Sequence, residues 1–406
     1  MSHLADDRSS GTAAHATAAS NGRGRVTVEI ADAARLSDMH AHWTDLVGRA
    51  AAPNVFMDPA LVGVAASIDP EARHRAVLAW KTADGSSRLV GIWSSSVGRP
   101  RRSMLPVQTI LVPAHAHDHL ATPVIDRDCL DETLDAMLDG IASDHQLPKI
   151  ITLDAMSAGE PTYEALLRVL EARDSAPCMF DRVRRPRLAS ALDGKAYLEN
   201  ALSSSTRKKL RQHRRKLSEK GALTSAVVTA PEAVRRALDQ FLAMEASGWK
   251  GRNGTAIADH EGDAAFMRGA MVALAEHGNA AVHSIDLDGR PISMQLVARA
   301  GAAAFTWKTT YDEAFQDFSP GMLLLEDYTT AFLADKSIAF VDSCSFDDTG
   351  FMAVWQERQE TADLWIDARR GGSLEFRALS GLQKTYRDVR TAAKTIYLRW
   401  CESRRK

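Results

Sequence analysis

The order of predicted elements repeats in the two halves of this chain, and the repetition limits the folds open to it. Each half begins with a strand, continues through helices, contains a hairpin and closes on another strand. The hairpins turn at Asp84-Gly85-Ser86 and at Asp288-Gly289-Arg290-Pro291, each between two β-prone runs. This order predicts an α/β protein built from two similar lobes, although the residues themselves show no repeat.

Composition excludes several classes of protein. A chain of 406 residues corresponds to about two to three domains of roughly 150 residues. Hydrophobic residues make up 45% and charged residues 25%, which is typical of globular proteins, and the net charge of -2 gives no reason to expect DNA as a partner. No run approaches the ~18 apolar residues of a membrane helix, so we expect no transmembrane segment. The cysteines show no disulfide framework, which makes a reducing cytoplasm the expected location.

The cysteines are scattered, without the spacing of a zinc site or a disulfide framework: Cys129, Cys178, Cys344 and Cys401. We therefore expect no metal. Changes in pattern along the chain predict a disordered tail at 1–24, a first lobe at 25–185, a second lobe at 186–370 and a C-terminal helical region at 371–406. Within the second lobe, Leu364 to Ile366 is expected to add an edge strand.

A strongly basic helix is predicted over residues 206–220, because the segment contains a single acid, Glu219, and eight cations: Arg207, Lys208, Lys209, Arg211, Arg214, Arg215, Lys216 and Lys220. Such a helix can bind tRNA, an anionic polysaccharide or lipid headgroups. Alternatively it is a solvated helix that joins the lobes. It lacks aromatic residues that would stack on bases, so tRNA is not the expected partner.

A strand is predicted to turn into a helix at Phe318-Ser319-Pro320-Gly321-Met322. Ser319 suits the N-cap, Pro320 suits the first helical position, and Gly321 leaves space for a ligand. The free N–H groups and the positive end of the helix dipole at such a junction attract anions. The alternative is a turn with no ligand.

Several segments of the second half resemble the GNAT superfamily: EASGWKGRNG from Glu245 to Gly254, the Asp288-Gly289 hairpin, WKTTYDEAF and SPGMLLLEDY. The resemblance is best from Ser204 to Val341. Within the superfamily it points to the two-lobed branch that includes cellulose-biosynthesis-associated acetyltransferases and Fem-type aminoacyl transferases. It implies two tandem GNAT-like lobes, each a mixed, mostly antiparallel sheet flanked by helices. The turn before Gly321 has fewer glycines than the family's signature, and after Asp342 the chain lacks the Tyr-Lys found in many relatives.

The resemblance also implies roles for individual residues. Acyl-CoA, with acetyl-CoA the expected donor, would be bound by Lys308, Phe318, Ser319, Pro320, Gly321, Met322 and Leu323. The acceptor would be bound by Trp249, Lys250, Arg252 and Tyr311. Asp342, after the predicted strand, would orient the acceptor or accept a proton, and its alternative role is to cap a loop.

The segment AHAHDHL places His115, His117 and His119 at alternate positions beside Asp118, which suggests a metal site. Three histidines in one extended segment rarely complete such a site, so we interpret the segment as a polar loop of the first lobe.

These observations predict an acyltransferase that passes an acyl group directly from acyl-CoA to an amine or hydroxyl of a small-molecule or saccharide acceptor, in polysaccharide or cell-envelope metabolism. The alternatives are an aminoacyl-tRNA-dependent transferase of Fem type and a catalytically degenerate scaffold in a polysaccharide-synthesis assembly. The oligomeric state is left open.

Overall fold

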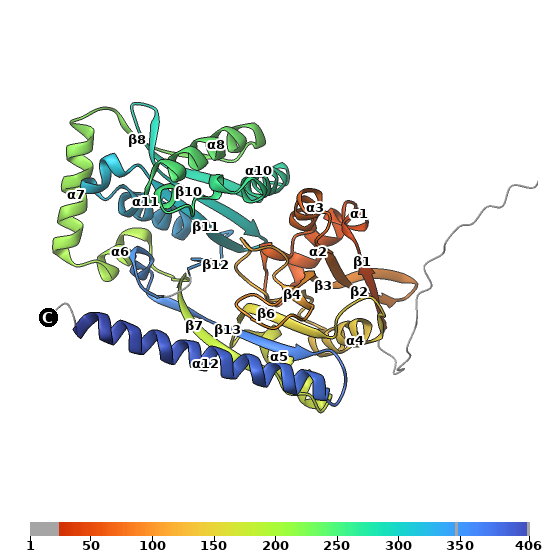
Figure 1. Cartoon of the computed structure of the whole chain (residues 1–406). Coiled ribbons are helices and arrows are strands. Elements are labelled where there is room, and N and C mark those ends of the chain that lie inside the picture. The colour runs from red at the N-terminus through yellow and green to blue at the C-terminus, as the bar shows by residue number, and fades with distance from the viewer. Residues whose placement is uncertain (1–23, 346–347, 404–406) are drawn as a thin grey trace, which may run out of the picture.

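The computed structural model describes residues 24–345 and 348–403. The predicted N-terminal tail therefore lies outside the described residues, apart from Gly24. Helices pack against a mixed, mostly antiparallel sheet, which confirms the predicted α/β class (Figure 1). Within the described residues the strands form one 13-stranded sheet in the order β1-β2-β3-β4-β6-β13-β7-β12-β11-β10-β9-β8, with β5 paired to β3.

The first half supplies seven of these strands. They are β1 Arg25–Ala31, β2 Arg75–Ala83, β3 Ser86–Gly98, β4 Thr109–Val112, β5 Val124–Ile125, β6 Ile150–Ser157 and β7 Cys178–Leu188. Its helices are α1 Ala33–Leu36, α2 His40–Arg49, α3 Pro59–Ile68, α4 Leu130–Ser143 and α5 Pro161–Ala172, with a short 3-10 helix, η1 Val55–Met57. The predicted hairpin joins β2 to β3, and Asp84 and Gly85 both have positive φ, as a tight two-residue turn requires.

The second half follows a similar order. Its strands are β8 Leu223–Val228, β9 Ala280–Leu287, β10 Arg290–Ala300, β11 Ala303–Tyr311, β12 Phe340–Asp342 and β13 Glu357–Asp367. Its helices are α6 Gly194–Ala201, α7 Ser204–Ser218, α8 Pro231–Ser247, α9 Trp249–Arg252, α10 Glu261–Glu276, α11 Pro320–Ala334 and α12 Leu374–Ser403, with 3-10 helices η2 Ile257–Asp259, η3 Glu313–Phe318 and η4 Phe351–Val354. The second predicted hairpin joins β9 to β10.

Strand β13 joins the two halves, because it lies between β6 and β7 and is antiparallel to both. The expectation of an edge strand at Leu364 to Ile366 is therefore wrong. Periodicity showed that the segment is extended, but it carried no information about which strands would flank it. The predicted lobe boundary after Arg185 falls inside β7, which also pairs with β12 through Leu188 and Val341. The boundaries of the two lobes stay a prediction.

An opening in the sheet lies between β11 and β12. The two strands are parallel neighbours only from Ala303 to Phe305, opposite Phe340 to Asp342. Beyond that point β11 continues to Tyr311 while β12 has ended, so the rest of this edge of β11 has no strand partner in the part of the chain that the structure describes. Parallel neighbours need a crossover, and here α11 provides it, beginning beyond the far end of β11.

Two helices near this opening share one hydrophobic core. Leu210 and Leu217 of α7 are buried with Leu323, Leu325 and Tyr328 of α11. The basic segment is thus helical, although the helix ends at Ser218 and not at Lys220 as predicted, and its apolar residues pack against α11. At the other end of the chain, α12 packs along β7 and β13 (Figure 1). Among the described helices, none combines the length and apolar character needed to cross a membrane.

Candidate functional site

A pocket of about 380 Å³ lies at the start of α11, beside the opening in the sheet. Seven of the predicted site residues line it: Trp249, Lys250, Tyr311, Ser319, Pro320, Gly321 and Met322. Glu245, Gly248, Thr309, Thr310, Glu313, Gln316 and Phe351 complete the lining. Segments on α8, α9, β11 and α11 are therefore brought together in one cavity, and the role of these residues in binding stays a prediction.

The start of α11 differs in detail from the expected junction. A 3-10 helix, η3, separates the end of β11 from α11, so the strand does not run directly into the helix. Ser319 occupies the N-cap position in a left-handed conformation with φ 51° and ψ 54°, and its side chain makes no capping hydrogen bond. The sequence could not indicate this backbone conformation, because serine is rarely found in it.

Few amide groups remain free at this helix start. Pro320 has no N–H, and the amides of Met322 and Leu323 both donate to the carbonyl of Ser319, at 3.0 and 3.2 Å. The Gly321 amide donates to no group among the described residues. A Cβ atom added at Gly321 would meet nothing within 4 Å, so the backbone there is open to the pocket. The helix dipole and one N–H group thus face the cavity.

Glu313 fixes the short helix α9 at the rim of the pocket. Its Oε1 accepts a 2.6 Å hydrogen bond from the amide of Trp249, and its Oε2 accepts one of 2.8 Å from Nη2 of Arg252. The hydrogen bond from Arg252 lowers the pKa of Glu313. Arg252 therefore stabilises the position of α9 and does not line the cavity. Trp249 does line the cavity, and half of its surface is exposed.

A buried acid, Glu245, also lines the pocket, and sequence reasoning missed it. Its Oε1 accepts a 2.6 Å hydrogen bond from Nζ of Lys250, and its Oε2 accepts one of 2.8 Å from the amide of Ile257. The signal was present in the sequence, because Glu245 follows Phe241 by four residues on the buried face of α8. A charged residue at an apolar helical position usually has a specific partner.

Three predicted donor-binding residues do not line the pocket. Leu323 is buried in the core under α11. Phe318 packs outward against α7, where Nζ of Lys220 lies 5.6 Å from its ring centroid. Lys308 is partly buried on β11, and burial together with the nearby charge of Lys250 lowers its pKa.

Asp342 is buried away from the pocket, with both carboxylate oxygens in use. Nη2 of Arg185 donates to its Oδ2 at 2.7 Å, and the amide of Cys344 donates to its Oδ1 at 2.8 Å. Its proposed catalytic role has not been tested. The geometry resembles the alternative, in which the aspartate caps the turn that follows β12.

The loop that carries the alternating histidines lies at the junction of the two halves. Trp307 of β11 donates from Nε1 to the carbonyl of His117 at 2.7 Å, and the His115 ring stacks on Phe266 of α10. Asp118 is buried, and its Oδ2 accepts from the amide of His115 at 3.1 Å, while its Oδ1 has no hydrogen-bond partner among the described residues. Burial raises the pKa of Asp118 to about 7. The described part of the chain holds no cluster arranged to bind a metal.

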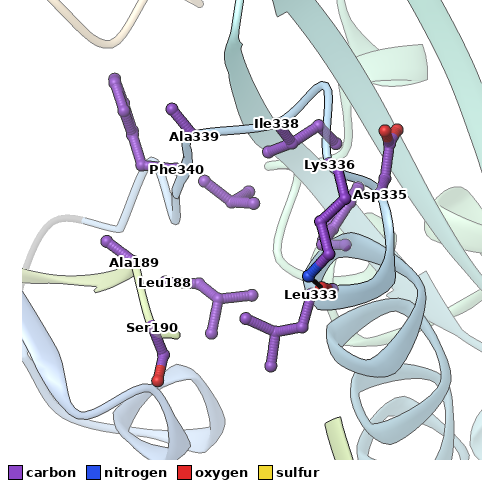
Figure 2. A pocket seen from close by; sticks show the side chains of 11 residues that line it. Leu188, Ala189, Ser190, Leu333, Asp335, Lys336, Ile338, Ala339 and Phe340 are labelled. Carbon is purple, nitrogen blue, oxygen red and sulfur yellow. Dashed lines mark hydrogen bonds between the residues drawn. The ribbon is translucent and has the colours of Figure 1, made fainter. Parts of the chain in front are cut away.

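A smaller pocket, of about 170 Å³, lies at the opposite end of α11. Figure 2 shows Leu188, Leu333 and Ile338 around it, with Asp335 and Lys336 at its margin. The 15 residues of α11 place the two pockets roughly 22 Å apart along the helix axis. None of the predicted site residues lines this second pocket.

Comparison with known proteins finds a family match within the second half. A model of the acetyltransferase (GNAT) domain matches residues 204–344. The structure of FemX superposes with a TM-score of 0.54 at 14% identity, over 80% of this chain and 95% of FemX. The C-terminal DUF2156 domain of a protein assigned as a lysylphosphatidylglycerol synthetase, from Agrobacterium fabrum, gives a TM-score of 0.50 at 14% identity, over 86% and 96%. At these identities the likeness establishes the fold alone. None of the curated proteins compared matches the chain.

Proposed function

Residues 204–344 are a GNAT-superfamily domain, and from this premise we propose that the protein is an acyltransferase that uses acyl-CoA, with acetyl-CoA as the expected donor. The acceptor is an amine or a hydroxyl of a small molecule or saccharide. One observation carries the proposal: the start of α11 faces a pocket into which Gly321 opens, at the edge of the sheet where β11 lacks a partner.

The geometry suggests how the donor is held. The Gly321 amide and the positive end of the α11 dipole attract the diphosphate of CoA. The extended arm of the donor lies along the unpaired edge of β11, where backbone groups are available for hydrogen bonds, as when a peptide adds to a sheet edge. Trp249 and Tyr311 then contact the acyl group or the acceptor from the sides of the pocket.

The reaction is direct transfer within a ternary complex. The acceptor's nitrogen or oxygen attacks the thioester carbonyl, the carbonyl oxygen becomes an oxyanion, and collapse of this intermediate expels the thiolate of CoA. The proton lost by the acceptor ends on the departing thiolate, directly or through a base. Burial raises the pKa of the Cys344 thiol well above its usual value, so it remains protonated and is unsuited to forming an acyl-enzyme.

A specific observation favours one alternative, a Fem-type transferase that takes its acyl group from aminoacyl-tRNA. The fold likeness to FemX extends over 80% of the chain, well beyond the GNAT domain. The basic helix α7 would then bind nucleic acid. A scaffold without activity is the other alternative, because the segment after Asp342 lacks the Tyr-Lys of many relatives.

Calorimetric titration with CoA and acetyl-CoA tests the proposal. We expect saturable binding of one donor per chain and release of CoA when a suitable amine is present. A protein that binds neither CoA nor any acyl-CoA cannot be an acyl-CoA-dependent transferase. Binding of tRNA that weakens steeply with salt, in the absence of CoA binding, would instead favour the Fem-type alternative.

A further inference from the structure

The pocket at the start of α11 has no surplus positive charge for an anionic donor. Lys250 is the cation among its lining residues, and it already pairs with Glu245 at 2.6 Å. The other acid of the lining, Glu313, pairs with Arg252 at 2.8 Å. One free amide and a helix dipole of about half a charge remain to face a diphosphate. Further cations nearby would strengthen the binding of such a donor.

Helix α7 lies against the segment that leads into this pocket. Leu210, His213 and Leu217 form its buried face. On one flank Arg214 donates to Asp327 at 2.7 Å and to the carbonyl of Leu323. On the other flank the His213 ring lies edge-on to the ring of Phe318, at 6.2 Å between centroids. Phe318 immediately precedes Ser319, Pro320 and Gly321, which line the pocket.

The flank of α7 beside Phe318 carries a row of lysines. Lys209, His213 and Lys216 follow one another at four and three residues, which places their side chains on one side of α7, and Lys220 lies in the turn after the helix ends at Ser218. All three lysines are exposed. Nζ of Lys220 lies 5.6 Å from the centroid of the Phe318 ring. We call these three residues the lysine row.

The lysine row is free to bind a ligand. Three arginines of α7 have acidic partners: Arg207 pairs with Glu199, Arg214 with Asp327 and Arg215 with Glu219, whereas Lys208 and Arg211 on the outward face form no ion pair with a described residue. Among the residues that the structure describes, no acid pairs with any member of the row. Three exposed lysines without an acidic partner among the described residues thus lie on the flank of α7, and in the turn after it, beside Phe318.

We propose that the lysine row binds the phosphate groups at the nucleotide end of the donor, outside the pocket at the start of α11. The inference rests on the proposed function and specifies which residues neutralise the donor's charge. In Figure 1, α7 stands at the outer end of the second half beside α11. The nucleotide end then lies on α7, and the thioester end lies toward the opening between β11 and β12.

A pair of matched triple variants tests the inference. Lys209→Gln, Lys216→Gln and Lys220→Gln are combined in one protein, and Lys208→Gln, Arg211→Gln and Arg215→Gln in the other. The second set lies on the outward face of the same helix and removes the same charge. Each exposed ion pair contributes up to about 1 kcal/mol, so loss of the row should weaken CoA binding about tenfold or more. The outward set should change it less than about threefold.

Calorimetry with CoA and with S-acetylpantetheine separates the possible outcomes. S-acetylpantetheine lacks the nucleotide, so its affinity should be equal in the parent and in the lysine-row variant, and a loss there would overturn the assignment to phosphate. If the parent does not bind CoA, the proposed function fails. If the parent and the row variant bind CoA equally, the inference fails while the function stands. A lysine-row variant that loses tRNA binding but keeps the parent's affinity for CoA would also overturn the inference.

Discussion

Arg185 and Asp342 form a buried ion pair in which Nη2 of the arginine lies 2.7 Å from Oδ2 of the aspartate. The pair connects β7, the last strand of the first half, to the end of β12 in the second. Nη1 of Arg185 also donates to the carbonyl of His119 at 2.9 Å. This contact places the histidine loop, the first half and the second half around one guanidinium, so Asp342 contributes to the junction whatever its part in catalysis.

Replacing Asp342 with alanine should lower the free energy of unfolding by about 3–5 kcal/mol, because it leaves the buried charge of Arg185 without its partner. Urea denaturation measures the loss. Glu360→Ala is the control, since Glu360 pairs with Arg182 on the surface and its removal should cost less than about 1 kcal/mol. An Asp342→Ala protein with parental stability but without activity would restore the aspartate to a catalytic role.

Replacing Gly321 with glutamate should weaken CoA binding by about tenfold or more, which corresponds to ~1.4 kcal/mol. The new carboxylate would occupy the open space at the pocket and repel phosphate. An acid in the first turn of a helix is favourable for folding, so the loss would not come from unfolding. Gly381→Glu, at an exposed and equally open glycine of α12, is the matched control for calorimetry. Equal affinities in both variants would exclude the α11 start as a donor site.

Binding of CoA should change the fluorescence of Trp249, which lines the pocket and is 50% exposed. Trp249→Phe should remove most of the change while calorimetry still detects binding, because phenylalanine retains an aromatic surface. Trp43 and Trp93 are buried in the first half and should report little. A ligand-dependent signal that survives in Trp249→Phe would place the donor elsewhere.

The stability of the protein should depend on the protonation of Asp118. Its pKa is about 7 in the folded protein, against an ordinary value near 4, so the folded state binds more protons between these values. The contribution of this group to stability is therefore full below pH 4 and is lost as pH rises through 7. The free energy of unfolding of Asp118→Asn, taken relative to that of the parent at the same pH, should therefore rise by on the order of 4 kcal/mol between pH 4 and pH 8.

Urea unfolding of both proteins at several pH values measures this difference, and groups that titrate alike in the two proteins cancel. Asparagine retains an oxygen that can accept the hydrogen bond from the His115 amide, so the loop should remain folded. A difference between the two proteins that does not change with pH would mean that Asp118 titrates normally and is not desolvated at the junction.

Local features of the fold could be predicted from the sequence because they depend on neighbouring residues. The two hairpins follow from Asp84-Gly85 and Asp288-Gly289, which accept positive φ. The basic helix follows from the spacing of Leu210 and Leu217. Pockets form from distant segments, and the family resemblance named both Trp249, as an acceptor-binding residue, and Gly321, as a donor-binding residue, before the structure showed that they line the same pocket.

Features that depend on long-range pairing could not be predicted. The burial of Asp118 requires β11 and α10 to pack on its loop, and the loop alone reads as polar. Ser319 was expected to cap α11 with its hydroxyl, but its left-handed backbone prevents this. The partner of Glu245 lies only five residues away, yet the acid's burial depends on the packing of α8.

The position of β13 sets the order in which the sheet can be completed during synthesis. Strands β6 and β7 leave the ribosome long before β13, yet they flank it and have no direct pairing with each other along the described ladder. Until the last strand arrives, each exposes a row of unpaired backbone groups toward a gap, which is the kind of edge on which chains aggregate. A fragment that ends after the first half would keep that gap permanently, so the two halves are interdependent in folding even though each has its own helices.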